Sequence, residues 1–309
     1  MEKDKSEDPV KAEATGKPAK YSKIRESLQR LWKRPYWVTA GLLFVAALIL
    51  ALIFLPSDKN KDIEIGILTT GLTEPGELDA IEKYLEKNDH LDYKLLDLTS
   101  PLSEMSSFTR FDVLWYHQID TAKIPTRLNN IQVNDSLKAY LGKGGNLLLT
   151  MEAMKYLNDL RVENVRPVAD TLEVSESGYG RKHGLHAYKT HPVFKGLNGG
   201  AYIFNPKQDT TVRQLGYMGA DVPENGRVIG VDWAYITLHE DKKLMVEYDK
   251  GEGKIIGIGS YMDFDMANYH KAQFEQFVNN VFSYLAGTIE GEQNYWNYKP
   301  NSVEPFNLV

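Results

Sequence analysis

Apolar and polar positions predict strands and helices in alternation from residue 62 onward. Short apolar runs, typical of buried strands, are separated by segments whose apolar residues recur at helical spacing. The predicted strands are 62–69, 93–98, 111–116 and 146–150, and the predicted helices are 77–87 and 134–141, the latter capped by Asn134. This alternation is typical of α/β proteins with a mostly parallel, doubly wound sheet, whose ligands lie at the carboxyl ends of the strands.

The second half of the domain has a different pattern, rich in glycine and in short β-type runs. Residues 184–188 and 228–235 predict strands, and 243–248 with 254–260 predict a hairpin across DKGEG, near one edge of the sheet. Residues 269–285 predict a closing helix with one broad apolar face. Residues 287–309 are polar and aromatic without a clear period, and we interpret them as a C-terminal tail.

The most apolar stretch lies near the N-terminus, where residues 38–55 (VTAGLLFVAALILALIFL) carry no charge. At a rise of 1.5 Å per residue, this run spans about 27 Å, close to the thickness of the hydrocarbon core of a bilayer. A core helix is disfavoured because every face is apolar. A cleaved signal peptide is disfavoured by the long preceding region and by the lack of a small-x-small cleavage site. We therefore predict a transmembrane helix at 38–56.

The charges that flank this run predict its orientation. Six basic residues precede it against one acidic residue, Glu26: Lys20, Lys23, Arg25, Arg30, Lys33 and Arg34. The positive-inside bias places the N-terminus in the cytoplasm and the domain at 57–286 outside it. Residues 1–37 then form a basic cytoplasmic tail that is disordered to interfacial. The predicted location is the periplasmic side of a bacterial inner membrane.

Composition excludes several classes of function. The chain has 309 residues, a net charge of −6 and no cysteine, so thiolate nucleophiles and cysteine-ligated metals are excluded. Residues 1–37 hold ten Lys/Arg and six Asp/Glu, a charge of +4, which leaves −10 for the remainder. An acidic domain of this kind lacks the basic surface that contacts phosphates, and we predict no nucleic-acid partner.

Three stretches resemble one known superfamily. Residues 137–150 (LKAYLGKGGNLLLT), 191–197 (HPVFKGL) and 247–261 (EYDKGEGKIIGIGSY) resemble, in order and spacing, segments of the class I glutamine amidotransferase-like superfamily. The ThuA-like (trehalose utilisation) branch is the most similar. The resemblance covers about residues 62–286 and implies a flavodoxin-like α/β fold for the whole domain.

The resemblance also identifies what the chain lacks. Glutaminases of this superfamily place a cysteine in a tight turn after the fourth strand and a His-x-Glu pair after a late strand. The corresponding segments here read Thr150-Met151-Glu152-Ala153 and Tyr261-Met262-Asp263. Because the turn holds neither cysteine nor serine, glutamine hydrolysis through a thioester or an ester is excluded.

Polar residues that follow the predicted strands define a candidate cleft. These residues are His117, Glu152, Tyr261, Asp263 and Asp265, with Trp115 or Trp233 as a face on which a ligand stacks. Such a set is suited to acid–base chemistry, to a divalent ion or to hydrogen bonds with sugar hydroxyls. The alternative interpretation is structural: a satisfied half-buried histidine, a glutamate at a helix start, and aspartates that serve as loop or N-cap residues.

A zinc site at His183, His186 and His191 is disfavoured, because the segment is interrupted by Gly and Pro and no carboxylate lies at a matching interval. We predict no metal and no cofactor. The resemblance assigns His191 to a structural or substrate-facing turn.

Two functions remain. The first is a membrane-anchored module without catalysis, which binds a ligand such as a glycan or serves as a scaffold for an envelope protein. The second is a carbohydrate-active enzyme of the ThuA-like type that uses carboxylate and histidine chemistry. The missing triad and the predicted anchor at 38–55 favour the first.

Overall fold

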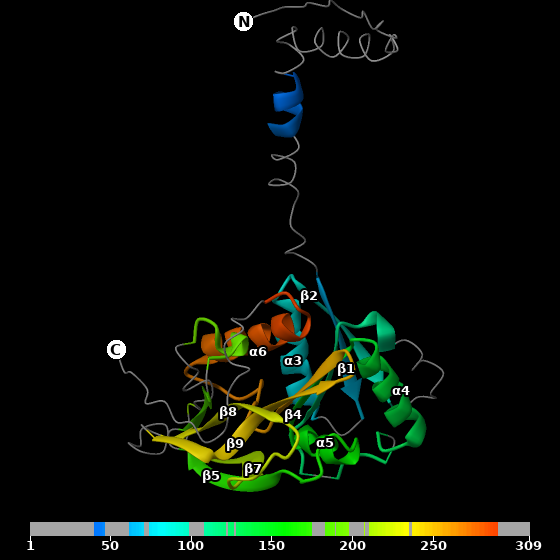
Figure 1. Ribbon diagram of the computed structural model, residues 1–309. Helices are drawn as coiled ribbons and strands as arrows, with labels where there is room; N and C mark the ends of the chain where they lie inside the picture. The colour runs from blue at the N-terminus through cyan, green and yellow to red at the C-terminus, as the bar shows by residue number, and fades with distance from the viewer. Residues whose placement is uncertain are drawn as a thin grey trace, which may run out of the picture. The chain divides into compact units, whose positions relative to one another are not determined.

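The computed structural model (Figure 1) divides into two units, residues 1–59 and 60–309. It describes residues 40–46, 62–70, 74–98, 108–121, 123–126, 128–174, 183–188, 190–197, 207, 210–234 and 237–289. In the first unit, residues 40–46 are helical and expose Leu42, Leu43, Phe44 and Val45. No helix within the described residues is long and apolar enough to cross a membrane. The rest of the predicted span at 38–56 lies outside the described residues, as do the predicted tail at 1–37 and residues 290–309.

The first half of the domain forms the parallel part of the sheet. In spatial order the strands are β2 (Leu91–Asp97), β1 (Ile63–Thr69), β3 (Val113–Gln118), β4 (Asn146–Met151) and β10 (Gly253–Ile258). Neighbours in this row pair in parallel. The inner strands are buried almost throughout, as expected for strands covered on both faces. The order 2-1-3-4 fits a flavodoxin-like domain.

The second half adds antiparallel strands. Beyond β10 the row continues with β9 (Thr237–Lys250), β7 (Thr210–Met218) and β5 (Val168–Val174), and β8 (Arg227–Ala234) pairs with β9 and with β6 (His183–Ala187). The sheet is therefore mixed, and the prediction of a mostly parallel sheet holds only for its first half. The β9–β10 hairpin lies inside the row rather than near an edge, because β10 pairs with β4 on its other side.

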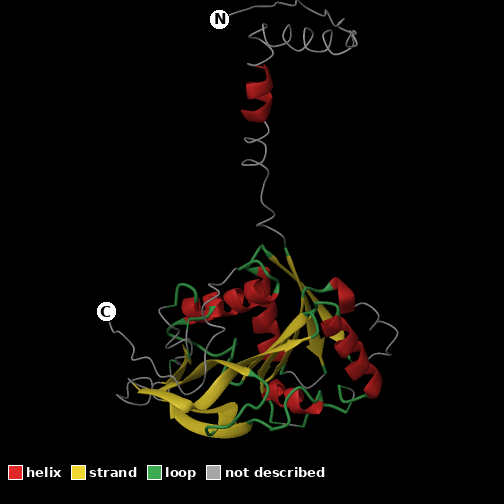
Figure 2. Cartoon of the chain, viewed as in Figure 1, coloured by secondary structure: helices red, strands yellow, loops and turns green. Residues whose placement is uncertain are grey.

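Helices cover both faces of the parallel half, as Figure 2 shows in red. Helices α3 (Pro75–Glu86) and α6 (Lys271–Leu285) pack on one face, and α4 (Ile131–Gly142) and α5 (Tyr156–Asp159) pack on the other. Two short 3₁₀ helices, η2 (Glu152–Lys155) and η3 (Pro192–Phe194), follow β4 and β6. Two apolar cores separated by the sheet confirm the doubly wound arrangement.

Two predicted helix starts differ from the structure. The cap of α4 is Asn130, whose side chain accepts from Gln132 N at 2.9 Å, whereas the predicted cap Asn134 lies inside the helix and accepts from Tyr156 Oη at 2.6 Å. Helix α3 begins at Pro75, earlier than predicted, because proline is tolerated where the helix has no N–H bond to make. The strands β5 and β7 were not predicted.

Candidate functional site

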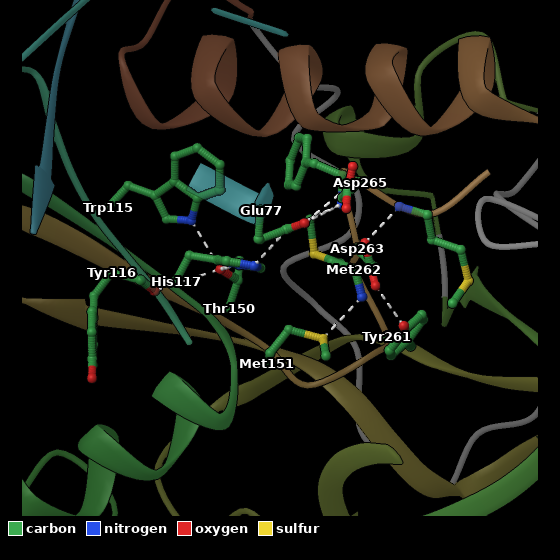
Figure 3. Close-up of polar contacts among 12 residues, drawn as sticks. Glu77, Trp115, Tyr116, His117, Thr150, Met151, Tyr261, Met262, Asp263 and Asp265 are labelled. Carbon is green, nitrogen blue, oxygen red and sulfur yellow. Dashed lines mark hydrogen bonds and ion pairs between the residues drawn. The ribbon is translucent and has the colours of Figure 1, made fainter. Parts of the chain in front are cut away.

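The carboxyl ends of β3 and β4 lie beside the loop that follows β10, and this edge of the sheet holds most of the predicted site (Figure 3). His117 and Thr150 are register partners near the ends of β3 and β4. Parallel pairing is what brings these two residues, distant in sequence, to one edge. The polar contacts at this edge converge on a residue that the sequence analysis did not select, Glu77.

Glu77 lies in the first turn of α3 with 3% of its surface exposed. Its Oε1 is 3.1 Å from His117 Nε2, and its carboxylate accepts the backbone N–H groups of Phe264 and Asp265 at 3.0 Å. Burial acts to raise the pKa of Glu77, but the His117 imidazole and these N–H groups outweigh it and hold the pKa below its ordinary value. Glu77 thus ties α3, β3 and the loop after β10 together.

His117 extends this network into the core. Its Nδ1 is 2.7 Å from Thr150 Oγ1, which also accepts from Trp115 Nε1 at 2.9 Å. In the neutral tautomer with its proton on Nε2, Nε2–H donates to Glu77, and Nδ1 accepts the Thr150 hydroxyl proton, which then is not donated to Tyr116 O at 3.5 Å. A hydroxyl, an imidazole and a carboxylate in series are the parts of a hydrolytic triad. Because Thr150 is fully buried, however, no substrate reaches its hydroxyl.

Met151 occupies the turn after β4 where the resemblance places a nucleophile. Its φ is 61° and its ψ is −129°, a conformation that non-glycine residues rarely adopt and that costs about 1–3 kcal/mol. The side chain is 3% exposed, and its Sδ accepts the N–H of Met262 at 2.9 Å. The sharp turn is present, but two methionines contact each other where a nucleophile and its base would be.

Asp263 and Tyr261 form the half-buried part of this edge. Tyr261 Oη donates to Asp263 Oδ2 at 2.6 Å, and Met266 N donates to Asp263 Oδ1 at 2.7 Å. Burial raises the pKa of Asp263 and, although the Tyr261 hydrogen bond opposes this, the nearby charge of Glu77 adds to the increase. Burial also raises the pKa of Tyr261. Asp265 joins through its backbone N–H, and its side chain is exposed.

Glu152 belongs to a different network. It is 1% exposed, its Oε1 accepts from Arg213 Nε at 2.5 Å, and its Oε2 pairs with Lys155. Its partners come from β7 and η2 rather than from the Glu77–His117 group. The structure therefore brings His117, Tyr261, Asp263 and the backbone of Asp265 together around Glu77, with Glu152 apart from them.

The two tryptophans differ in exposure. Trp115 is fully buried and packs edge-on against Phe282, so it presents no face on which a ligand stacks. Trp233 is half-buried in β8.

The histidines considered for zinc lie in β6 and η3. His186 Nδ1 contacts Ala187 O at 2.8 Å, and His191 lies 3.8 Å from Glu247. The His183 side chain is outside the described residues. Within the described part of the chain, no three His, Cys, Asp or Glu residues are grouped to hold a metal.

A pocket of about 470 Å³ opens at the opposite edge of the sheet, where β3, β4 and β10 begin. The residues that line it are Thr109, Phe111, Asp112, Tyr140, Lys143, Gly144, Gly145, Asn146, Glu252, Lys254, Tyr284, Leu285, Ala286 and Gly287. None of the predicted site residues is among them.

The sequence contains a signal for Glu77. The turn Pro75-Gly76 follows the predicted strand 62–69, so a glutamate just after it begins a helix at the carboxyl edge of the sheet. Since β1 pairs with β3, that glutamate is delivered next to His117. Thr150 could have been identified in a similar way, because it is the last residue of the predicted strand NLLLT and so lies at the carboxyl edge of the sheet.

No protein-family model and no curated protein matches the chain. Among solved structures, a ThuA-like protein from Parabacteroides merdae is similar with a TM-score of 0.48 and 14% identity, over 75% of this chain and 93% of that protein. A glutamine amidotransferase from Methylobacillus flagellatus has a TM-score of 0.38 and 9% identity, over 77% and 99%. A β-galactosidase from Bacillus circulans has a TM-score of 0.44 and 10% identity, over 74% of this chain and 31% of the enzyme.

The chain spans only 30–31% of the length of the similar β-galactosidases. Each TM-score is below 0.5 and each identity is below 25%, so no residue role, activity or ligand is carried over. A ThuA-like protein and a glutamine amidotransferase are nonetheless among the similar structures.

Proposed function

We propose that this chain is a catalytically silent module of glutamine amidotransferase-like fold, held at a membrane, which binds a ligand or an envelope protein. The observation that carries the proposal is the contact between Met151 Sδ and Met262 N–H at the turn after β4. A thioether has no proton to transfer and is a very weak base, and this one is buried. The neighbouring Glu77–His117–Thr150 series has all its partners inside the protein.

The energetic cost of this edge supports a structural role. The positive φ of Met151 is strained, and the side chains of Glu77 and His117 are almost completely desolvated. In any folded protein such costs must be offset by the surrounding structure. Here they are offset by hydrogen bonds that join α3, β3 and the loop after β10. The edge therefore stabilises the fold.

The membrane part of the proposal rests on the uncharged run 38–55 and on the basic residues before it. The described helix at 40–46 exposes four large apolar side chains, as a lipid-facing segment would. In this proposal the N-terminus is cytoplasmic and the domain lies in the periplasm. A tethered module acts at one place in the envelope, which suits assembly and binding.

The proposal is tested by fractionation and protease accessibility together with an assay for turnover. We expect the full chain to sediment with inner membranes, and external protease on spheroplasts to digest the domain while an N-terminal tag survives. The purified chain is expected to release no ammonia from glutamine and no sugar from a panel of glycosides. A soluble chain in the cytoplasm, or turnover of any of these substrates, contradicts the proposal.

A second candidate function, a carbohydrate-active hydrolase, is favoured by one observation. Asp263 is half-buried, its pKa is raised by burial and by Glu77, and Tyr261 hydrogen-bonds to it, so it has features of a general acid. Turnover of a glycoside by the wild type that Asp263→Asn abolishes, with the fold intact, would favour this enzyme over the silent module.

A further inference from the structure

The pocket at the amino edge of the sheet has a frame that is held rigidly. Asn146 N donates to Tyr140 Oη at 3.1 Å, and Asn146 Oδ1 accepts from Lys254 N at 2.9 Å. The Asn146 amide also donates to Asp112 O at 3.2 Å. One asparagine thus joins α4, β3, β4 and β10 behind the pocket. Its volume of about 470 Å³ falls within the range of roughly 300–1,000 Å³ that is typical of small-molecule sites.

One wall is fixed by a buried carboxylate. Glu247 is fully buried, accepts from Tyr284 Oη at 2.7 Å and lies 3.1 Å from Lys254 Nζ. Burial acts to raise the pKa of Glu247, but the nearby His191 imidazole, Lys254, the Tyr284 hydrogen bond and Arg227 outweigh it and lower the pKa to about 2. Lys254 also pairs with Asp249 at 2.8 Å. Lys254 is therefore held in place at the pocket wall by two carboxylates.

Two opposite charges at the rim are not held in this way. Lys143 and Glu252 are both exposed, and neither is paired with any residue in the described part of the chain. The backbones that carry them are close, because the Cβ position of Gly144, the residue after Lys143, is 3.9 Å from Glu252 Cβ. An exposed cation and an exposed anion on one rim, neither of them in an ion pair, can each accept a ligand group of the opposite charge.

The helix ends at the pocket favour one orientation of a charged ligand. Helices α4 and α6 both end at the pocket; Lys143 is itself the C-cap residue of α4, whereas α6, whose C-cap is Ala286, has no basic residue in its last turn. The carbonyl ends of helices favour a positive group nearby. A ligand cation is favoured near the end of α6 and near Glu252, and a ligand anion near Lys143. With two lysines, Asp112 and Glu252, the lining has no net formal charge.

We propose that this pocket binds a small zwitterion of amino-acid or dipeptide size, with its ammonium group toward Glu252 and its carboxylate toward Lys143. This inference rests on the proposed binding function and names the ligand class and the place where it binds. It assigns the ligand to the amino edge of the sheet, away from the edge where His117 and Asp263 lie. A neutral sugar would leave both rim charges without a charged partner, and a simple anion or cation would satisfy only one.

The experiment measures binding to the full chain, purified in a detergent without a sugar head group. The probes are the standard amino acids and alanylalanine, with N-acetyl-alanylalanine and alanylalanine amide as analogues that lack one charge. Calorimetry or saturation-transfer NMR gives the affinities. We expect wild type to bind alanylalanine or a free amino acid about tenfold more tightly than either analogue, the factor for one charge-assisted hydrogen bond.

The variants assign each charge. Lys143→Ala should bind alanylalanine amide, which lacks the carboxylate, as tightly as it binds alanylalanine. Glu252→Gln should bind N-acetyl-alanylalanine, which lacks the ammonium group, as tightly as it binds alanylalanine. Lys138→Ala, on the exposed side of α4, and Glu173→Gln, exposed on β5, are matched controls and should bind as wild type does. Ala286→Trp or Thr109→Trp should block the pocket and abolish binding, with circular dichroism and thermal melts to check folding.

Three outcomes overturn the inference: no zwitterion binds wild type, the blocked variants bind as tightly as wild type, or the rim variants keep their sensitivity to both ligand charges. Neutral sugars that bind equally to wild type and to both rim variants also count against it. If zwitterions fail to bind while the chain is membrane-bound and inactive, only this inference fails. If wild type turns over a substrate and Asp263→Asn does not, the proposed function fails instead.

Discussion

The two edges of the parallel sheet differ in how their polar groups are used. At the carboxyl edge, Glu77, His117 and Thr150 are almost fully buried, and their hydrogen bonds are made within the protein. At the amino edge, a pocket of about 470 Å³ is lined by charged residues, of which Lys143 and Glu252 have no partner in the described part of the chain. Within the described part of the chain, the polar groups at the edge that the fold favours for ligands are mostly buried, and a pocket lies at the other edge.

The comparison shows that the kind of residue at an edge does not by itself make a site. The carboxyl edge has the richer chemistry, with a hydroxyl, an imidazole and carboxylates within hydrogen-bond distance of one another. Those groups satisfy one another, and a satisfied buried network stabilises a single conformation. The amino edge has simpler chemistry, but its charges face solvent and can exchange water for a ligand. A binding site is distinguished from a network that only stabilises the fold by polar groups that are accessible to solvent and lack partners within the protein.

The largest expected effect is at the carboxyl edge. Glu77→Ala removes the partner of His117 and of two backbone N–H groups, and we expect a loss of about 3–5 kcal/mol in the free energy of unfolding, as for other broken buried pairs. Urea unfolding measures it. The exposed Glu173→Ala is the control and should change stability by less than about 0.5 kcal/mol. A loss below about 1 kcal/mol for Glu77→Ala would mean that the hydrogen bonds at this edge contribute little to the stability of the fold.

The pH dependence of this loss has a definite sign. The pKa of Glu77 is lowered in the folded state, so its contribution to stability is present above its ordinary pKa of 4.5 and is lost as pH falls through the lowered value. The difference between wild type and Glu77→Ala should therefore be constant near neutral pH and shrink below pH 4.5. A difference that grows on acidification would contradict the assignment of Glu77 as a carboxylate.

Cysteine labelling compares the accessibility of the two edges directly, because the natural chain contains no cysteine. In Met151→Cys the thiol is buried, and we expect it to react with a thiol reagent roughly 100-fold more slowly than the thiol of Thr109→Cys at the pocket rim. A factor of this size corresponds to a local opening that costs about 3 kcal/mol. Both thiols should react alike in urea. Equal rates in the native protein would show that the carboxyl edge is open.

A smaller effect is expected at Asp263. Its pKa is raised in the folded state by burial and by Glu77, so its protonated form adds stability below its ordinary pKa of 3.8, and this is lost as pH rises through the raised value. Asp263→Asn stays neutral. The variant should therefore gain stability relative to wild type between pH 3 and 7, by about 1 kcal/mol or less, because the side chain is partly exposed. A flat difference in urea unfolding across this range would contradict the prediction.

The smallest effects on stability are expected at the amino edge. Lys143→Ala and Glu252→Gln should each change the free energy of unfolding by less than about 0.5 kcal/mol, because both side chains are exposed and unpaired with any described residue. Denaturant unfolding without ligand checks this. A loss above 1 kcal/mol in either variant would show that the rim charges are structural, and the contrast between the two edges would not hold.

The sequence predicted the parallel half of the fold well, and the reason is local. Runs such as residues 111–116 and 146–150 are buried along their whole length, so composition alone marks them as central strands. The strand β5 was missed because most of its residues are exposed or half-buried, and only pairing with β7 makes it a strand. The hairpin was predicted near an edge of the sheet, because the turn sequence DKGEG indicates only that β9 and β10 pair and not that β10 also pairs with β4.

The site was predicted in part, because periodicity does not encode contacts between distant segments. His117, Tyr261 and Asp263 were selected as strand-end residues, but the carboxylate that joins them, Glu77, is 187 positions from Phe264 in sequence. Burial of Thr150 and the ion pair of Glu152 with Arg213 likewise depend on tertiary packing. The pocket at the amino edge is built from helix ends and a turn. In a sequence these segments serve only to mark where helices and strands end, so they were not considered as a binding site.

The place of β10 has a consequence for how the chain is made. Strand β10 (Gly253–Ile258) is the neighbour of β4 in the middle of the row, yet among the described strands it is the last to leave the ribosome. Until residue 258 emerges, β4 keeps an unpaired edge of apolar residues, the kind of surface that aggregates or pairs wrongly. The sheet closes late, through contacts between distant segments that form slowly. We therefore expect the yield of folded protein to depend on how well this edge is protected during synthesis, as well as on the stability of the finished sheet.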